Sequence, residues 1–347
     1  MQSSKFVKAG LLAAILSFVA VASWELYLRY QKTPLFYDDN EALWSDKRAM
    51  VYKPSNEATV FIGSSRIKYD LDIPTWVTLT GQDAIQLANQ GSNPRPVLDD
   101  LANDINFKGK LIIDVTEPLF FGAFAPRDED TYKKMAYFKK RTPTQRVSFE
   151  INRVLESKFI FLDQDDFTIN AMLDQVMIPP RPGVFRLPVF PFDFGGNYFT
   201  RQSFMTPRFV ADTNLQNQVK AIWHTISSLP MPPPPRGEEL QAIMNSVKVN
   251  VDKIKSRGGQ IIFVRTPSSG PFRMGEMKGF PREVYWNQLL AITGCPGIYF
   301  EDYPATAHLI CPEWSHLKPS DAVIYTRSLV GALEEKGWSF GKTTLAQ

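Results

Sequence analysis

Two short motifs, far apart in the 347-residue chain, carry the residue types that nucleophilic catalysis needs. The first is a Gly-Ser-Ser turn that ends at Ser65, between a short apolar segment and a helical pattern. A serine placed there lies at the carboxyl edge of a parallel sheet, and the helix start offers N–H groups to a developing oxyanion. The second is the segment Glu-Trp-Ser-His from Glu313 to His316. A carboxylate at that spacing orients the imidazole through Nδ1 and leaves Nε2 free, so we predict a serine of the Gly-Ser-Ser turn as nucleophile, His316 as base and Glu313 as orienting acid.

Neither motif is specific by itself. Gly-Ser-Ser is common in loops, and a histidine at the start of a helix is often a cap or a surface residue. The order of the two motifs along the chain favours catalysis, because the serine follows the first predicted strand and the histidine precedes the last helix. The chain has three histidines, at positions 224, 308 and 316, so any mechanism that needs an imidazole must use one of them.

Segments of strand length alternate with segments of helical spacing around these motifs. The predicted strands are Thr59 to Ile62, DAIQLANQ, Leu111 to Val115, QIIFVRTP and GIYFEDYP. The predicted helices include PVLDDLANDI, EELQAIMNSVKVNVDKIKSRGG, REVYWNQLLAI and HLKPSDAVIYTRSLVGALEEKG. This alternation predicts βαβ units and a parallel sheet in one α/β domain, formed by residues 59–122 and 237–340.

Two segments fall outside this alternation. Residues 123–236 are rich in Phe, Pro and Arg and hold too many aromatic residues to stay solvated, so we expect an inserted cap of helices and ordered loops. Residues 33–58 are expected to form a linker with a short helix around Glu41 to Arg48.

The amino-terminal residues 1–32 combine a charged start, with Lys5 and Lys8, and an apolar run at residues 9–24. One interpretation is a signal peptide cleaved at the small-x-small sequence of residues 20–22. We favour an uncleaved transmembrane anchor, because sixteen apolar residues are long for a signal peptide and interfacial aromatic residues follow directly, namely Trp24, Tyr27 and Tyr30. In both cases the lysines stay inside and the rest is exported. A buried amphipathic helix is disfavoured because the run has no polar stripe.

At this point the chain resembles the SGNH/GDSL hydrolase superfamily, over residues 59–122 and 245–335. The resemblance implies a flavodoxin-like three-layer α/β/α fold, the SGNH hydrolase fold. It places the nucleophile at Ser65 in FIGSSR, an oxyanion-hole N–H at Gly91 in ANQGSNP, and the acid and base in PEWSHL. The layout is similar to that of membrane-anchored bacterial cell-envelope members, some of which modify or bind polysaccharide.

The chain departs from the superfamily pattern at two places. The acid is Glu313 where the superfamily usually has Asp. After the third strand the superfamily has Gly-x-Asn-Asp, whose Asn side chain completes the oxyanion hole, whereas this chain reads IIDVTEPLF. Thr116 and Asn93 are then the nearest candidate donors, beside the N–H groups of Ser65 and Gly91.

Arginines near the same sheet edge are candidate ligands for an anionic substrate. Arg66 follows the nucleophile, Arg265 ends the strand IIFVR, and Arg273 follows in the next loop. Guanidinium groups suit carboxylated or phosphorylated glycans. The alternative is that they pair within the structure, with carboxylates at positions 70, 117, 276 and 283.

The two cysteines, Cys295 and Cys311, close a loop of seventeen residues just before the acid-x-x-His segment. In an oxidising compartment we expect them to form a disulfide, which contributes about 3 kcal/mol by chain entropy. Two buried thiols are the alternative.

These features favour a serine esterase or O-acyltransferase that acts through an acyl-enzyme on an acylated glycan or another small ester. We expect it at the bacterial inner membrane with its catalytic domain outside the cytoplasm, or secreted if the amino terminus is cleaved. Envelope proteins are further candidate partners, and no metal or cofactor is expected because no cluster of His and Cys exists. A net charge of +3 argues against a nucleic-acid binder. The competing hypothesis is an inactive protein of this fold that binds polysaccharide or a partner.

Overall fold

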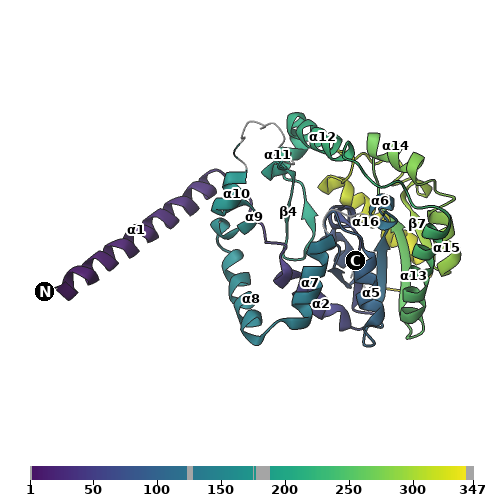
Figure 1. Cartoon of the computed structure of the whole chain (residues 1–347), viewed down its shortest axis with the longest axis horizontal. Coiled ribbons are helices and arrows are strands. Elements are labelled where there is room, and N and C mark those ends of the chain that lie inside the picture. The colour runs from purple at the N-terminus through teal and green to yellow at the C-terminus, as the bar shows by residue number, and fades with distance from the viewer. Residues whose placement is uncertain (1, 123–127, 175, 177–187, 341–347) are drawn as a thin grey trace, which may run out of the picture. The chain divides into compact units, whose positions relative to one another are not determined.

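A computed structural model describes residues 2–122, 128–174, 176 and 188–340 (Figure 1). Parts of the insertion predicted at residues 123–236, namely 123–127, 175 and 177–187, lie outside the described residues. The chain divides into two units. We call Asp39–Thr142 with Phe185–Gln347 the α/β unit, and Met1–Asp38 with Pro143–Val184 the anchor unit.

The α/β unit contains a five-stranded parallel sheet in the order β2-β1-β3-β6-β7. Its strands are β1 (Ala58–Ile62), β2 (Asp83–Gln86), β3 (Lys110–Asp114), β6 (Gln260–Arg265) and β7 (Gly297–Tyr299). Each was predicted from its apolar run, and the three central strands are almost wholly buried, as strands covered on both faces must be. The mixed α/β fold with a parallel sheet is therefore confirmed.

The strand order reverses between β1 and its neighbours, which is the flavodoxin-like pattern. Since crossovers between parallel strands are right-handed, this reversal puts the helices that follow β1 and β2 on opposite faces of the sheet. The helices α3 (Ser65–Asp70) and α4 (Ile73–Thr80) after β1 pack against the last helix, α16 (Pro319–Glu335). The helix α5 (Arg95–Asn103) after β2 packs against α13 (Gly237–Lys255), which in turn contacts α15 (Trp286–Thr293). The arrangement is that of a three-layer α/β fold.

Two segments predicted outside the α/β domain belong to it. The short helix predicted near Glu41 exists as α2 (Glu41–Ala49), capped by the Asn40 side chain, but its Trp44 is fully buried in the core rather than part of a linker. This helix packs against α7 (Asp128–Lys140). From the predicted insertion, α11 (Pro207–Ala211), α12 (Thr213–Ser227) and the ribbon of β4 (Gly196–Asn197) and β5 (Ser203–Phe204) also lie in this unit.

The rest of the predicted insertion is in the anchor unit, so the insertion is not one cap. This unit consists of α1 (Gln2–Tyr30), α8 (Pro143–Glu156), the 3₁₀ turn η2 (Ile160–Leu162), α9 (Gln164–Phe167) and α10 (Ile169–Asp174). The span Lys5–Tyr30 of α1 is long and apolar enough to cross a membrane. The helix predicted at the amino terminus is therefore present.

Candidate active site

The turn that carries Ser65 joins β1 to α3 at the carboxyl edge of the sheet, next to the point where the strand order reverses. Gly63 is required there, because a Cβ at this position would lie 2.6 Å from Cβ of Asp114. Ser64 caps the helix by accepting from the Arg66 N–H at 3.4 Å. Ser65 is the first helical residue, half-exposed, and its N–H has no acceptor within the helix.

The acid-x-x-His segment forms a fixed turn before α16. The Leu317 N–H donates to Asp70 Oδ1 at 2.9 Å, and the Ser269 N–H donates to the Trp314 carbonyl at 2.9 Å. Trp314 has φ of 80°, which is uncommon for a residue with a large side chain. Such conformations persist where surrounding contacts impose them, and here they aim the histidine at the serine turn.

Ser65, His316 and Glu313 form a hydrogen-bonded chain. Nε2 of His316 lies 2.8 Å from Oγ of Ser65, and Nδ1 lies 3.0 Å from Oε1 of Glu313. The same carboxylate oxygen accepts the His316 backbone N–H at 2.6 Å, and both residues are buried. The structure therefore brings together the three residues predicted as nucleophile, base and acid. Glu313 reaches the imidazole, so its extra methylene relative to Asp does not prevent the contact.

Aromatic side chains surround the imidazole. The rings of Tyr69, Phe194 and Trp223 lie 4.4, 5.7 and 6.3 Å from the His316 ring, centroid to centroid. Trp223, on α12, also donates its indole N–H to Oε2 of Glu313. Burial, together with the Glu313 carboxylate, raises the pKa of Tyr69, so this phenol stays neutral beside the histidine. The second carboxylate oxygen of the acid is thus held by a residue from the segment predicted as an insertion.

The four predicted oxyanion-hole residues differ in what they offer. Thr116 donates its hydroxyl to Asp114 Oδ2 at 3.2 Å and lies 2.8 Å from Oγ of Ser64. Since a hydroxyl has one proton, Thr116 does not also serve an oxyanion in this arrangement. Asn93 is held in place, because its backbone N–H donates to Asp128 at 2.7 Å and its Oδ1 accepts the Arg95 N–H at 2.9 Å. Neither contact uses its side-chain Nδ2, which is the group that would donate to an oxyanion. The main-chain N–H groups of Ser65 and Gly91 and the side-chain amide of Asn93 remain as candidate donors.

The loop after β2, which carries Gly91, is fixed beside the serine turn. The N–H of Asn89 donates to the Gly63 carbonyl at 3.2 Å. Arg201, fully buried, donates to the Ala88 carbonyl and to Oδ1 of Asn89, both at 3.0 Å, and pairs with Asp39. Gly91 itself has φ of 60°, in the left-handed region that glycine adopts without strain. This loop is therefore positioned by Arg201, whose charge is paired with Asp39 at the start of the α/β unit.

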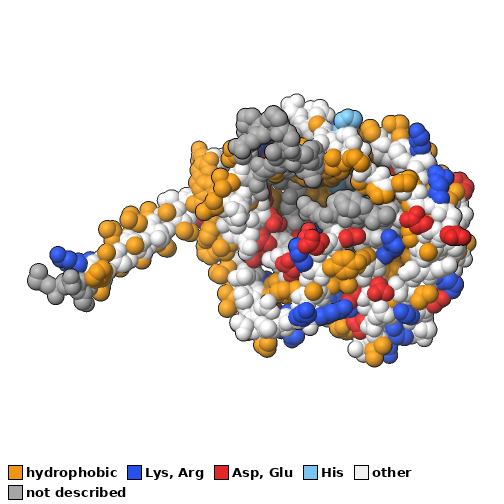
Figure 2. Space-filling model, in the orientation of Figure 1, with side chains coloured by type: hydrophobic (Ala, Val, Ile, Leu, Met, Phe, Trp, Pro, Cys, Tyr) orange, Lys and Arg blue, Asp and Glu red, His pale blue; other side chains and the backbone are white. Residues whose placement is uncertain are grey.

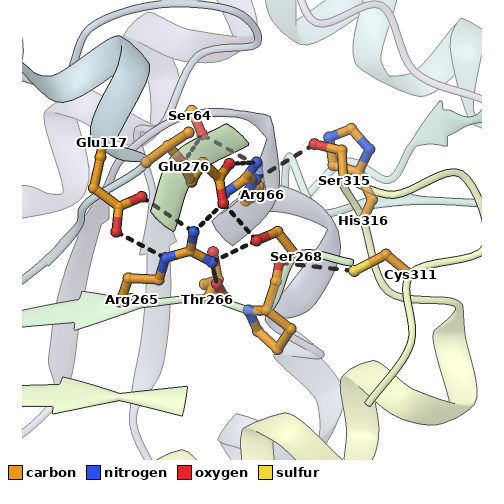
Figure 3. A network of polar contacts seen from close by, with 12 residues as sticks. Ser64, Arg66, Glu117, Arg265, Thr266, Ser268, Glu276, Cys311, Ser315 and His316 are labelled. Carbon is orange, nitrogen blue, oxygen red and sulfur yellow. Dashed lines mark hydrogen bonds and ion pairs between the residues drawn. The ribbon is translucent and has the colours of Figure 1, made fainter. Parts of the chain in front are cut away.

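The arginines predicted to bind an anionic substrate pair with carboxylates instead (Figure 3). Arg265 makes a two-pronged contact with Glu117, at 3.1 Å on both sides, and also pairs with Glu276. Arg66 pairs with the same Glu276, and both guanidinium groups are buried. The prediction is therefore wrong for Arg66 and Arg265, because their charges are neutralised inside the protein. Arg273 pairs with Glu301 at the surface.

Glu276 is the shared partner of the two buried arginines and also accepts the Ser268 hydroxyl at 2.6 Å. Burial alone would raise its pKa, but the charges of Arg265 and Arg66 outweigh burial and lower the pKa to about 2. Asp114, at the end of β3, has its pKa raised by burial and accepts from Thr116 and Thr266. The polar layer below the serine turn is thus a structural network.

The predicted disulfide is wrong, because Cys295 and Cys311 are both free and buried. Cys295 precedes Pro296, whose carbonyl accepts from the Phe263 N–H in the middle of β6. Sγ of Cys311 lies 3.7 Å from the Pro267 carbonyl, beyond the end of β6. Cys295 thus lies beside Phe263 and Cys311 beside Pro267. At about 3.3 Å per residue, roughly 13 Å of chain separates Phe263 from Pro267, whereas a disulfide needs Cα atoms within about 7 Å. The alternative of two buried thiols holds.

Alkylation in denaturant without reductant is therefore expected to add two alkyl groups to the full-length chain, measured by intact mass. In the native protein the reaction should be slow, because burial covers both thiols and raises the pKa of both. A Cys295→Ser variant should add one group under the same denaturing conditions. An unmodified mass in denaturant would contradict the free thiols.

The residues that sequence reasoning missed lie far from the acid-x-x-His segment along the chain but contact it in the fold. Trp223, Tyr69 and Phe194 carry no motif, and only a known fold would place them against the histidine. Asp114 did carry a signal, since it is an acid at the end of a buried strand in IIDVTEPLF. No family model matches the chain, and no curated protein matches it.

Proposed function

We propose that the chain is a serine hydrolase of the SGNH/GDSL kind, an esterase or an O-acyltransferase. The observation that supports this most is the chain of contacts from Ser65 through His316 to Glu313 at 2.8 and 3.0 Å, with the serine half-exposed and the other two buried. A nucleophile within hydrogen-bond reach of a base that a third group orients is the geometry of an activated serine. The flavodoxin-like strand order supports the same superfamily.

In the proposed mechanism His316 Nε2 takes the proton of Ser65 as Oγ attacks the ester carbonyl. Glu313 accepts the Nδ1–H and stabilises the imidazolium that forms. The main-chain N–H groups of Ser65 and Gly91 hold the oxyanion, with the Asn93 side chain as a further candidate donor. His316 then protonates the leaving alcohol, and water or an acceptor hydroxyl attacks the acyl-Ser65 with the same histidine as base.

The substrate we propose is an acylated glycan of the cell envelope or another small ester. The amino-terminal helix supports a place at the bacterial inner membrane, with Lys5 and Lys8 inside and the α/β unit outside. The second candidate, an inactive glycan- or partner-binding protein of the same fold, is favoured by one observation, namely that the hydroxyl of Thr116, which follows the third strand where the superfamily has an Asn, is engaged with Asp114.

The two candidates are separated by treating the full-length protein in detergent with a fluorophosphonate and with p-nitrophenyl acetate. The enzyme is supported by labelling that peptide mapping places on Ser65 and by turnover that Ser65→Ala abolishes. Acetate release without an acceptor indicates an esterase, and acetyl transfer to an added oligosaccharide indicates a transferase. Absence of both labelling and turnover would refute the enzyme and leave the binding protein.

Trp223→Phe is expected to lower kcat about ten- to a hundredfold with little change in KM. The substitution keeps a ring near His316 but removes the N–H that holds Glu313, and a hydrogen bond to a charged group contributes about 1.5–3 kcal/mol. The matched control is His224→Ala on the same helix, since this side chain is exposed. An unchanged kcat in Trp223→Phe would show that the indole does not position the acid.

A further inference from the structure

An apolar surface in the anchor unit is exposed to solvent. It is formed by α8, of which no residue is buried, and by α10 (Figure 2). On α8 the exposed apolar side chains recur at helical spacing, namely Val147, Ile151, Val154 and Leu155, with exposed fractions from 39% to 61%. On α10 they are Ile169, Met172 and Leu173, at 39% to 73%. Soluble helices bury such a stripe, so this one requires a partner.

The carboxyl end of α8 is attached to the end of the apolar helix α1. The Arg29 guanidinium donates to the Lys158 carbonyl, two residues after α8. The Phe161 N–H donates to Oε2 of Glu25 at 3.2 Å. The ring of Trp24 meets the edge of Phe167, with centroids 6.3 Å apart. The chain after α8 is thus packed on the last two turns of α1.

Those last turns lie at the level of a bilayer surface if α1 spans the membrane. A hydrocarbon core of about 30 Å takes about 20 helical residues, so a span beginning after Lys8 ends near Leu28. Trp24, Tyr27 and Tyr30 are then the aromatic residues of the interface. Because Arg29 and Glu25 hold the segment after α8, that segment lies at the same level.

We propose that α8 and α10 lie on the membrane surface, with their apolar faces inserted into the leaflet at which α1 ends. A bilayer fits this face better than a second copy of the chain does. The apolar face of α8 and α10 lies next to the carboxyl end of α1, where the exposed apolar side chains of α1 stop. The ionisable residues of α8 balance in charge, with Arg146 and Arg153 against Glu150 and Glu156, and Arg153 pairs with Glu150 at 2.8 Å. Attachment therefore depends on apolar area rather than on anionic lipids. The anchor unit is then held to the bilayer at two places, which goes beyond the proposed chemistry.

The test uses the full-length chain in phosphatidylcholine vesicles, with single spin labels at Ile151→Cys, at Asn152→Cys about 100° around α8 from Ile151, and at Leu16→Cys within α1. Collision rates with oxygen, which enters bilayers, and with a water-soluble nickel chelate are measured for each. The wild-type chain, with its two buried thiols, gives the labelling background. We expect the oxygen-to-nickel ratio to be several-fold higher at Ile151→Cys than at Asn152→Cys, and unchanged when phosphatidylglycerol is added.

Equal access of nickel to the two α8 labels would overturn the proposal. So would a short distance between Ile151→Cys labels of two chains at low protein-to-lipid ratio, because a second copy would then cover the face. The Leu16→Cys label shows which part of the proposal is wrong when the α8 labels are not embedded. If Leu16→Cys is embedded, α1 spans the membrane and only the surface attachment of α8 and α10 is refuted. If it is not embedded, the anchor itself fails, and neither result bears on turnover at Ser65.

Discussion

His316→Ala is expected to lower kcat for ester hydrolysis by about 10⁴-fold or more, and Ser65→Ala by a similar factor. The reason is that each residue is useful only with the other: Oγ of Ser65 is a weak nucleophile until Nε2 of His316, 2.8 Å away, takes its proton. The double variant should therefore be no slower than either single variant. The measurement is the steady-state rate with p-nitrophenyl acetate, corrected for the background reaction.

Two neighbouring substitutions serve as controls for this series. Ser64→Ala removes a hydroxyl that contacts Thr116 and caps α3, so it should cost about 1 kcal/mol of stability and leave most of the activity. His308→Ala removes an exposed imidazole that contacts the Pro304 carbonyl and should be neutral. If Ser64→Ala abolished turnover while Ser65→Ala did not, the nucleophile would have been assigned to the wrong serine.

The pairing of Ser65 with His316 was predictable because each motif adjoins an element that the sequence marks, the first strand and the last helix. Apolar runs of strand length mark β1, β3 and β6, and parallel strands meet with their carboxyl ends at one edge. A serine directly after β1 is therefore at that edge. The turn before α16 is brought there as well, because α16 packs on α3, which Ser65 begins.

What the sequence could not supply is which groups meet across long separations. The sequence places Arg66 and Arg265 correctly at the carboxyl edge of the sheet. Whether they bind a ligand or pair inside the protein depends on Glu276, which reaches both from α14 (Gly270–Gly279). The spacing of two cysteines suggests a disulfide, but the strand β7 that lies between them separates their levels along the sheet.

For the insertion, too, the sequence does not show which distant segments each helix packs against. Composition indicates that residues 123–236 are ordered, and the described parts of this region are helical or folded. It does not indicate that α12 supplies Trp223 to the acid while α8 belongs with α1, because both helices have an amphipathic pattern. One apolar face is covered by a core and the other is exposed, and only tertiary structure distinguishes them.

Glu276→Gln is expected to destabilise the α/β unit by about 3–5 kcal/mol, the cost of removing one member of a buried ion pair. The amide keeps the shape of the side chain but leaves Arg66 without its charged partner and Arg265 with Glu117 alone. Arg66 is affected more than Arg265 by this loss, since Nη1 of Arg66 already has no hydrogen-bond partner among the described residues. The measurement is the urea midpoint and Tm of the full-length protein in detergent.

Two controls identify the cause of the destabilisation in Glu276→Gln: a substitution in a surface ion pair, and the dependence of stability on pH. Glu301→Gln, which breaks the surface pair with Arg273, should change stability by no more than about 1 kcal/mol. Because the folded protein holds the pKa of Glu276 near 2, below the ordinary value of 4.5, its contribution is complete above pH 4.5 and is lost as pH falls through about 2. The gap between wild type and Glu276→Gln should therefore narrow over that acid range. A gap that stayed constant there would mean that the loss of stability in Glu276→Gln does not come from the charge of the carboxylate.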